Sequence, residues 1–544
     1  MTDNNIPSLK LNKYWEEIFQ GETKDLFEKK ILPVYIKRCR WFGSKARKIE
    51  NIKITENIII GEKESITHLL FLLIKYSGKI REMYMLPVTF SSLKENMDKI
   101  NPRGIITYLI VNKQKGILLD GVYDEKFKKN LLLMIKTRCK IRGKDGVIIN
   151  YPGEFLRKFS LKNLPIKNSK VLTAEQSNTS ILYDKHLLFK LFRKLDGGMN
   201  PDLEIVKFIS ENTNFSNVPP FAGYIEYKKK NSKQVIMGML QGFIPNRGDA
   251  WEYTVDSIKK YYEKILKNKV KFENFNIPQS IFATEQKIPG VIQKLIGQNY
   301  INMTKILGKR TGELHLALSS NKKDKNFSPE PITYSYQKTV VSSMKSQTCR
   351  VFGFLKGHFD NLKDNLKKDA NEILKNESKI EEYYENLLKK KISATKIRIH
   401  DDYHLGQVLY TGKDFVIIDF EGEPARPLKE RRLKKSPIKD IAGMLRSFHY
   451  ATYNALFVQS LSEKEIAMLE PWAEVWYLYM TGVFLKEYFK IVKNASFIPH
   501  KKEDIETMLN AFLIEKAVYE LGYELNNRPD WVVIPLKALL YFTK

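Results

Sequence analysis

One stretch constrains the fold and chemistry of this chain more than any other: residues 396–424, KIRIHDDYHLGQVLYTGKDFVIIDFEGEP. An apolar run ends in a cluster of histidine and aspartate, and a later apolar run ends in Asp419. Between them, residues 408–418 carry two short apolar runs around a Thr-Gly-Lys-Asp turn, which predicts a β-hairpin. The hairpin returns Asp419 to the end where Asp402 and Gln407 lie, so we expect two carboxylates and an amide to converge.

This set of side chains suits phosphoryl transfer from a nucleotide. The reaction needs a carboxylate that accepts the proton of the attacking hydroxyl, and hard oxygen ligands that hold Mg²⁺ against the phosphates. We therefore predict that Asp402 is the catalytic base and that Gln407 and Asp419 hold the metal. His400 is expected to brace this catalytic loop by hydrogen bonds, and His404 to line the acceptor site. ATP and Mg²⁺ are the cofactors that this chemistry implies.

The same segment resembles known kinases. His-x-Asp, an amide five residues after the Asp, an apolar strand and a further Asp form the layout of kinase catalytic and metal loops. Residues 400–451, which begin HDDYHLGQVLYTGKDFVIIDFEGEP, resemble the signature of maltokinases, within the aminoglycoside-phosphotransferase-like kinases. Asp401 stands where glycine is usual, whereas Gln407 and Glu421 are features of the maltokinase group itself. Asp440 resembles a position that ties down the catalytic loop.

The resemblance implies a fold and a reaction. The fold is α+β and bilobal, protein-kinase-like (aminoglycoside phosphotransferase-like), with a mostly antiparallel N-terminal β cap domain and a helical C-terminal lobe. The expected domains are 1–155 for the cap, 156–250 for the kinase N-lobe and 251–544 for the C-lobe. The implied enzyme is an ATP-dependent maltokinase, which converts maltose to maltose 1-phosphate and feeds α-glucan synthesis from trehalose. A complex with trehalose synthase is compatible with this function, as is a monomer or a homodimer.

Residues 171–212 are expected to bind the nucleotide phosphates. Two strands at 180–183 and 187–192 are followed by a Gly-Gly and Asn-Pro break and then by a helix. Lys190 lies in the second strand, and Glu204 lies in the first turns of the helix. Kinases need such a strand lysine, positioned by a helix carboxylate, to hold the phosphates.

Two further segments are assigned to the nucleotide. The glycine-free loop 174–180 takes the place of a Gly-rich phosphate loop, and its Ser177 and Asn178 are expected to donate to phosphate oxygens. A buried strand predicted at 235–243 leads into a Pro-Asn turn that suits a hinge between lobes. Main-chain groups from Met239 to Gln241 are candidates for binding adenine, although a buried strand alone is the simpler interpretation of this run.

Acceptor binding is assigned to two regions. Glu421, Glu423 and Arg426 follow the metal-binding strand and are candidates for contacts to the sugar or for support of the metal. The predicted C-terminal helices carry many aromatic residues, among them Tyr519 and Tyr523, whose faces suit the C–H surfaces of sugars. Each aromatic residue by itself is more typical of a core, so only the group is a hypothesis.

Composition limits the remaining function classes. The formal net charge of +29 invites a nucleic-acid interpretation, but the lysines lie in runs such as 228–230, 389–391 and 434–435 that alternate with Glu rather than with stacking aromatics. We interpret this charge as solvated surface that attracts anionic nucleotide, and predict no nucleic-acid partner. No apolar run approaches the ~20 residues that span a bilayer, so no membrane partner is expected. Three scattered cysteines fit a reducing cytoplasm.

Two alternatives stay open. In an extended segment, His400, Asp402 and His404 would point to one face, as the ligands of a metal-dependent hydrolase do. Histidine is scarce, with eight in all, and a hydrolase leaves Lys190 and Gln407 unexplained. A kinase of the same fold that acts on another sugar or an aminoglycoside-like acceptor is the nearer alternative, because fold alone does not set the substrate.

Overall fold

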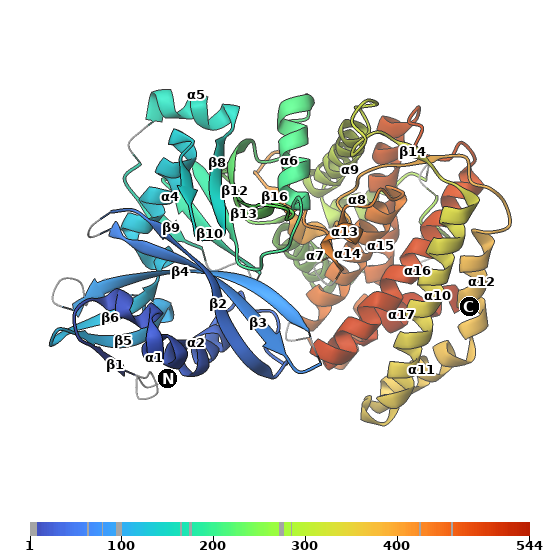
Figure 1. The fold of residues 1–544 in the computed structure, drawn as a ribbon. Coiled ribbons are helices and arrows are strands. Elements are labelled where there is room, and N and C mark those ends of the chain that lie inside the picture. Colours follow the sequence, from blue (N-terminus) through green and yellow to red (C-terminus); the bar gives the residue numbers. More distant parts are fainter. Residues whose placement is uncertain are drawn as a thin grey trace. The chain divides into compact units, whose positions relative to one another are not determined.

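The computed structural model describes residues 8–62, 65–78, 80–93, 101–163, 166–172, 177–270, 272, 277–283, 286–423, 426–458 and 461–543. The chain forms two compact units (Figure 1). The first comprises residues 1–207 and 219–245, and the second comprises residues 208–218 and 246–544. The chain passes from the first unit to the second at Pro245 and Asn246, where the sequence predicted a hinge.

The first sheet of the first unit has the strand order β1-β5-β6-β4-β3-β2. The bounds are Ser8–Leu11 (β1), Ile49–Ile60 (β2), Thr67–Tyr76 (β3), Arg81–Ser92 (β4), Ile105–Val111 (β5) and Gln114–Asp120 (β6). Strands β2, β3 and β4 pair in antiparallel fashion, in line with the mostly antiparallel cap that the resemblance implied, whereas β1 pairs in parallel with β5. Strand β3, between β4 and β2, is buried on both faces: Leu70 and Leu72 enter one core, and Leu69 and Phe71 enter another.

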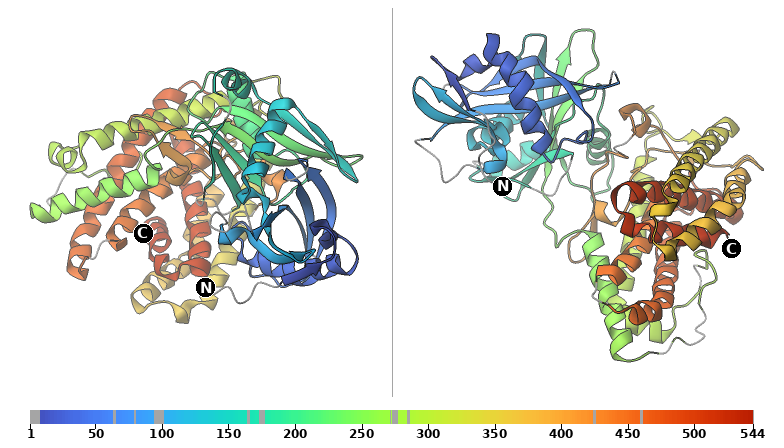
Figure 2. Two further views of the ribbon diagram at one scale, coloured as in Figure 1. Left: turned by 90° about the vertical axis from the view of Figure 1, so that its left-hand side faces the viewer. Right: turned by 90° about the horizontal axis from the view of Figure 1, so that it is seen from below.

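Helical segments at the N-terminus pack on this first sheet (Figure 2). They are the 3₁₀ segment Trp15–Phe19, α1 Gly21–Leu26, the π segment Phe27–Ile31 and α2 Leu32–Arg38. Helical structure therefore continues to Arg38, and Pro33 is tolerated because it lies in the first turn of α2. Trp41 and Phe42 are 8% and 1% exposed in the same core, so they act as structural plugs.

The second sheet has the order β7-β8-β12-β13-β11-β10-β9. Its strands are Lys140–Arg142 (β7), Gly146–Pro152 (β8), Ser169–Val171 (β9), Asn178–Tyr183 (β10), Leu187–Phe192 (β11), Phe221–Lys229 (β12) and Val235–Gly242 (β13). Helix α4 Glu125–Thr137 packs on β8 and α5 Glu154–Asn163 packs on β12, whereas α6 Pro201–Asn212 belongs partly to the first unit and partly to the second. The sheet begins at Lys140, within the range 1–155 that the sequence analysis assigned to the cap, because β8 pairs with the distant strand β12.

A buried ion pair joins the two sheets. Arg193, just after β11, lies 2.8 Å from Asp120 at the end of β6, and both side chains are 1% exposed. The guanidinium also donates to Thr179 and lies 4.9 Å from the ring centre of Trp41. Removing one partner of such a buried pair costs about 3–5 kcal/mol, because the other charge remains unpaired. The pair therefore fixes the first sheet against the second.

His68 in β3 makes the stability of the first unit depend on pH. Its ring is 4% exposed and lies against Trp15 and Phe19. Nδ1 lies 2.8 Å from the amide oxygen of Asn57 and donates to it, and buried Nε2 has no hydrogen-bond partner among the described residues. Burial lowers the pKa of His68 from 6.5 to about 4. Because the unfolded chain takes up this proton more readily, stability is full above pH 6.5 and falls toward pH 4.

We expect wild-type protein to lose about 3 kcal/mol of unfolding free energy from this one group between pH 7 and pH 4. The variant His68→Gln keeps a hydrogen-bond donor but does not titrate, so its unfolding free energy should fall less over the same range. Chemical denaturation at pH 7.0, 5.5 and 4.5 measures the unfolding free energy of wild type and variant. His500→Gln, at an exposed position, is the matched control and should follow the wild type. Equal slopes for His68→Gln and wild type would contradict the assignment.

The second unit is mostly helical. Its helices are α7 Ala250–Lys267, α8 Gly290–Ile296, α9 Gln298–Leu318, α10 Tyr334–Gly357, α11 Asp364–Lys375, α12 Glu377–Asn386, α13 Leu428–Arg431, α14 Ile438–Val458, α15 Glu463–Val492, α16 Lys502–Asn527 and α17 Val533–Thr543. Two short antiparallel pairs join β14 Glu330–Pro331 to β15 Thr395–Lys396, and β16 Val408–Tyr410 to β17 Phe415–Ile417. Across the described residues, each helix is too short or too polar to cross a membrane.

The core of this unit takes up several aromatic residues that the sequence grouped as sugar-binding candidates. Trp472 and Trp476 on α15 are fully buried, and Tyr479 is 3% exposed. Close packing of α9 on α15 explains part of this burial, since a Cβ at Gly308 would lie 2.4 Å from the carbonyl oxygen of Phe484. Trp472 and Trp476 therefore stabilise the helical unit and do not face a ligand.

Candidate active site

A buried aspartate holds the catalytic loop that follows β15. Asp440, at the start of α14, is 2% exposed and accepts hydrogen bonds from the backbone N–H groups of His400 at 2.8 Å and Asp401 at 2.9 Å. His315 on α9 is fully buried, with Nε2 3.2 Å from Asp440 and Nδ1 2.9 Å from the hydroxyl of Tyr488. Burial opposes the charge of Asp440, but the hydrogen bond from His315 and the nearby histidines keep its pKa below the usual value. Asp440 thus ties down the loop, as the resemblance implied.

Asp440→Ala is expected to destabilise the second unit strongly. Two backbone donors and His315 would lose their acceptor, and each unsatisfied buried donor costs about 1–3 kcal/mol. Urea unfolding should therefore show a loss of at least about 3 kcal/mol. Asp364→Asn, whose side chain is 96% exposed at the start of α11, is the control and should leave stability unchanged. A loss below about 1 kcal/mol in Asp440→Ala would mean that other groups hold the loop.

Asp401 turns the catalytic loop sharply. Its φ of 67° lies in the left-handed region, which glycine adopts freely and which aspartate tolerates better than most residues. This conformation explains why glycine is usual at the position in the kinases that the segment resembles. The turn also interrupts the extended backbone, so His400, Asp402 and His404 do not alternate onto one face as the hydrolase alternative requires.

Both histidines of the catalytic loop have structural partners. His400 is fully buried and its Nε2 lies 2.9 Å from the carbonyl oxygen of Ile418, so it braces the loop as predicted. His404 accepts a hydrogen bond from the N–H of Gly406 at 3.1 Å, and burial lowers its pKa. Within the described residues, these histidines and Asp402 form no metal-ligating cluster. The described residues thus give the hydrolase alternative no support, and His404 does not line the pocket beside Asp402.

Asp402 lies in the wall of a narrow pocket inside the second unit. Its carboxylate is 25% exposed and lies 3.5 Å from the ammonium group of Lys516 on α16. Glu423 and Arg426, which form an ion pair at 2.7 Å, line the same pocket together with Tyr519. The free volume is about 30 Å³, room for one or two water molecules, so a sugar can enter only if these side chains move.

The predicted acceptor residues thus separate into two groups. Glu423, Arg426 and Tyr519 share the pocket with Asp402, and burial together with the charge of Glu423 raises the pKa of Tyr519 to about 12. Tyr523, four residues further along α16, is 47% exposed and packs against the guanidinium of Arg528. The prediction for Tyr523 is not supported, because Tyr523 lies one helical turn beyond Tyr519 and does not line the pocket.

Sequence reasoning missed the ion-pair partners of two lysines in the second unit. The run Lys434-Lys435 was interpreted as solvated surface, but Lys434 is 7% exposed and its ammonium group lies 2.8 Å from Glu330. Lys435 donates to the carboxylate of Asp401, and Lys439 lies 3.8 Å from the same carboxylate. That interpretation is wrong for this run. Their position in the sequence could have indicated a structural role, since both lysines lie inside the segment that resembles maltokinases.

The hairpin positions a second set of polar groups. Val408 pairs with Ile417, as the alternation predicted, and the N–H of Ile418 donates to the carbonyl oxygen of Gln407. The side-chain amide of Gln407 donates to Asp419 at 3.1 Å, which brings the two predicted metal ligands together.

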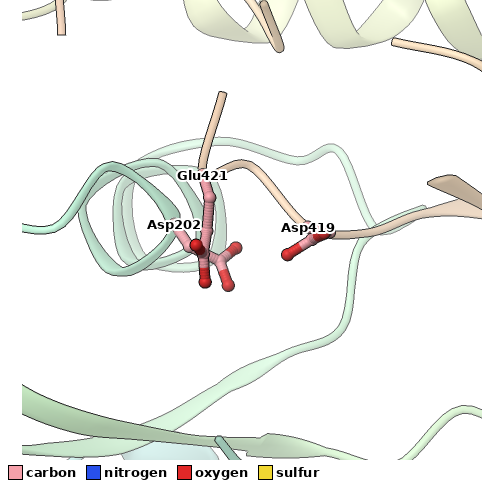
Figure 3. A group of neighbouring side chains, drawn as sticks. All are labelled: Asp202, Asp419 and Glu421. Atoms are coloured by element: carbon pink, nitrogen blue, oxygen red, sulfur yellow. The ribbon is translucent and has the colours of Figure 1, made fainter. Parts of the chain in front are cut away.

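Glu421 joins this set. Its carboxylate and that of Asp419 offer oxygen atoms within 4.8 Å of each other, and Figure 3 shows both side chains on the segment that follows β17. Oxygen ligands at this separation fit a hard divalent cation such as Mg²⁺. The structure therefore places Glu421 at the candidate metal site, whereas the sequence analysis left it between sugar contact and metal support.

Lys190 has a carboxylate partner in the first unit that the sequence analysis did not name. The lysine is 4% exposed on β11, and its ammonium group lies 2.8 Å from Asp202 in the first turn of α6. The sequence analysis assigned this role to Glu204, two residues later. Asn200 accepts hydrogen bonds from the N–H groups of Asp202 and Leu203, so the capped first turn is what presents Asp202 to the lysine.

The other nucleotide predictions have mixed outcomes. Ser177 and Asn178 lie just before and at the start of β10, whereas residues 174–176 of the predicted phosphate loop lie outside the described residues. Met239 and Gln241 lie in β13, a central strand that pairs with both β11 and β12. The main-chain groups of β13 are engaged in pairing with the neighbouring strands on both sides. The prediction that Met239 and Gln241 bind adenine through the main chain is therefore wrong.

Comparison with known proteins shows that part of the chain matches a protein family. The Maltokinase N-terminal cap domain family matches residues 35–124, from α2 past the end of β6. This part of the chain is therefore similar to the N-terminal cap domain of maltokinases. Two curated glucosamine kinases are also similar: the enzyme of Mycolicibacterium smegmatis at 28% identity and that of Streptacidiphilus jiangxiensis at 23%, each over 141 residues, or 26% of this chain. These alignments span about a third of the length of the relatives, 33% and 30%.

Solved structures extend the likeness beyond the cap domain. A glucosamine kinase in complex with glucosamine, ADP and inorganic phosphate superposes on 90% of this chain and 93% of its own, with a TM-score of 0.57 at 13% identity. A second crystal form of glucosamine kinase covers 92% and 96%, with a TM-score of 0.58 at 15% identity. This likeness establishes the fold. The α+β kinase fold with an N-terminal β cap, predicted from sequence, is confirmed.

Proposed function

We propose that this chain is an ATP-dependent sugar kinase that phosphorylates the anomeric hydroxyl of maltose, giving maltose 1-phosphate and ADP. The observation that carries the proposal is a maltokinase cap domain on a kinase fold whose catalytic loop presents Asp402 to a pocket. In the proposed pathway, a trehalose synthase supplies maltose, and α-glucan synthesis consumes the product.

Asp402 is the proposed base. It orients the acceptor hydroxyl and takes its proton as the phosphoryl group transfers in line. Lys516 supports the ionised form of Asp402 from 3.5 Å. Burial works against the charge of Lys516, but the carboxylates of Asp402 and Glu520 raise its pKa above the usual value, so it stays charged at neutral pH. Asp440 and His315 keep the backbone of the catalytic loop in place for this step.

Two sets of side chains are proposed to act on the phosphates. Gln407, Asp419 and Glu421 would hold Mg²⁺, which when bound neutralises the charge of the transferring phosphoryl group. Lys190, kept in position by Asp202, is the proposed contact to the nucleotide phosphates. Ser177 and Asn178 stay proposed donors to phosphate oxygens.

Glucosamine is the second candidate acceptor. Glucosamine kinase structures cover at least nine-tenths of this chain, and one of them was solved with glucosamine and ADP. An amino sugar carries an ammonium group, and the pocket beside Asp402 offers Glu423 and Glu515 as carboxylate partners. Both already have basic neighbours, Arg426 and Lys439, so binding of the amine would require these ion pairs to exchange.

Release of ADP from ATP and Mg²⁺ with a panel of acceptors tests the proposal. The panel contains maltose, glucosamine, glucose, trehalose, maltotriose and an aminoglycoside. We expect turnover with maltose and a product without a reducing end, because the phosphate occupies the anomeric position. Turnover with glucosamine alone would replace maltose by the second candidate. No turnover with any of these acceptors would contradict the proposed substrate class.

A further inference from the structure

A second and larger pocket lies within the helical unit. It has a free volume of about 640 Å³, in the range of small-molecule sites, and lies among α11, α14, α15 and α17 (labelled in Figure 1). The described residues that line it are all different from those that line the pocket beside Asp402. The reaction proposed above makes no use of it.

Aromatic rings form one part of its wall. Tyr453 comes from α14, Tyr477 from α15 and Tyr541 from α17. Each ring presents an apolar face and a polar hydroxyl, which is the combination that binds a ligand with both C–H and O–H surfaces. Tyr541 is 48% exposed, so part of this aromatic surface is already in contact with solvent and open to a ligand.

Hydrogen-bonding groups of both kinds accompany the rings. Glu470 and the exposed Glu474 on α15 supply acceptor oxygens. His449 on α14 supplies a donor: its Nδ1 lies 3.1 Å from a guanidinium nitrogen of Arg446, which can only donate, so Nδ1 accepts. Burial and the charge of Arg446 keep the pKa of His449 well below its ordinary value, so the ring is neutral and its proton lies on Nε2.

The charges of the pocket do not favour an anion. Four carboxylates line it, and three basic side chains, namely Lys368, Arg446 and Lys537, lie among them. Arg446 already binds Glu520 at 2.8 Å, and Lys537 already binds Glu470, so a phosphate or a nucleotide would have to compete with both ion pairs. Hydroxyl groups, in contrast, accept and donate at once and can insert between the carboxylates and His449 without displacing a charge.

We propose that this pocket is a second carbohydrate site, which binds a neutral oligosaccharide between the tyrosine rings and the carboxylates of α15. The size, the three tyrosines and the paired charges support this ligand over a nucleotide. The site is separate from the catalytic pocket and does not depend on which acceptor that pocket takes. Because binding is measured without ATP, failure of the kinase assay would not affect the result.

Isothermal titration with maltotriose in the absence of nucleotide tests the proposal. The variant Tyr519→Ala serves as the background, because it weakens the binding of sugar in the pocket beside Asp402. Maltotriose should still bind to this variant. Adding Tyr541→Ala and Glu474→Gln should then weaken the remaining binding about 10-fold or more, or about 1.4 kcal/mol. Both positions are exposed, so the fold should survive, and the thermal midpoint of each variant checks this.

Tyr334→Ala provides the matched control. Tyr334 is 43% exposed at the start of α10 and lines neither pocket, so its loss should leave maltotriose binding unchanged. Three results would overturn the proposal. The first is that maltotriose does not bind to Tyr519→Ala. The second is that Tyr541→Ala and Glu474→Gln leave maltotriose binding intact. The third is that spermidine binds in place of maltotriose, which would indicate a site for an organic cation attracted by the carboxylates.

Discussion

Replacing Asp402 with asparagine is expected to lower kcat by about 10²–10⁴, the usual contribution of a positioned general base. The amide has nearly the same shape as the carboxylate, but it cannot take the proton of the acceptor hydroxyl. The loop should keep its conformation, because Asp440 and not Asp402 holds its backbone. Steady-state kinetics with saturating acceptor and ATP measure the loss.

The affinity for ATP decides whether the loss is chemical. We expect the Kd of ATP in Asp402→Asn to stay within a few-fold of wild type, because the proposed phosphate contacts lie elsewhere in the chain. Asp364→Asn, an exposed aspartate of the same unit, should retain full activity. If Asp402→Asn keeps more than about a tenth of the wild-type kcat, the loss is smaller than a general base contributes. Asp402 then does not have this role.

Replacing Asp419 with asparagine should also lower turnover strongly, because it removes a proposed ligand of Mg²⁺. Loss of a residue that only supports a ligand lowers metal affinity or activity about 10–100-fold, so loss of a direct ligand should exceed that range. The Mg²⁺ concentration for half-maximal turnover should rise in Asp419→Asn, and turnover at saturating Mg²⁺ should stay low. Titration of activity with MgCl₂ gives both values.

Two neighbouring carboxylates make this experiment specific. Glu421→Gln should shift the Mg²⁺ titration as well, since its oxygen atoms lie within 4.8 Å of those of Asp419. Glu423→Gln is the control: Glu423 pairs with Arg426 beside the pocket, so its loss should alter the KM for the acceptor and not the Mg²⁺ dependence. An unchanged Mg²⁺ dependence in Asp419→Asn would remove the metal from this position.

Local pattern was enough to predict the parts of the chain that depend on near neighbours. The hairpin of β16 and β17 follows from two apolar runs around a four-residue turn, and its pairing is the predicted one. The three long strands β2, β3 and β4 follow in the same way from apolar runs separated by turn residues. Hydrophobic periodicity and turn chemistry act over a few residues, so they are visible without the fold.

Predictions failed where the partner of a residue is distant in sequence. The adenine assignment of Met239 and Gln241 failed because strand order, which pattern does not show, makes β13 a central strand. The contact of Lys190 with Asp202 was not predicted, because the phase of α6 decides which carboxylates face the sheet. Lys434 and Lys435 appeared solvated because their partners, Glu330 and Asp401, lie on other segments.

The amino-acid sequence by itself therefore determined the chemistry-bearing loop and hairpin, the antiparallel strands of the cap and the helical nature of the second half of the chain. These features arise from residue type and spacing within a single element. Only the tertiary structure decided which carboxylate faces Lys190, that Asp440 and His315 hold the catalytic loop, and which aromatic residues of α15 and α16 are core. Those outcomes depend on helix phase, strand order and burial, and each of them is set when segments far apart in the chain pack together.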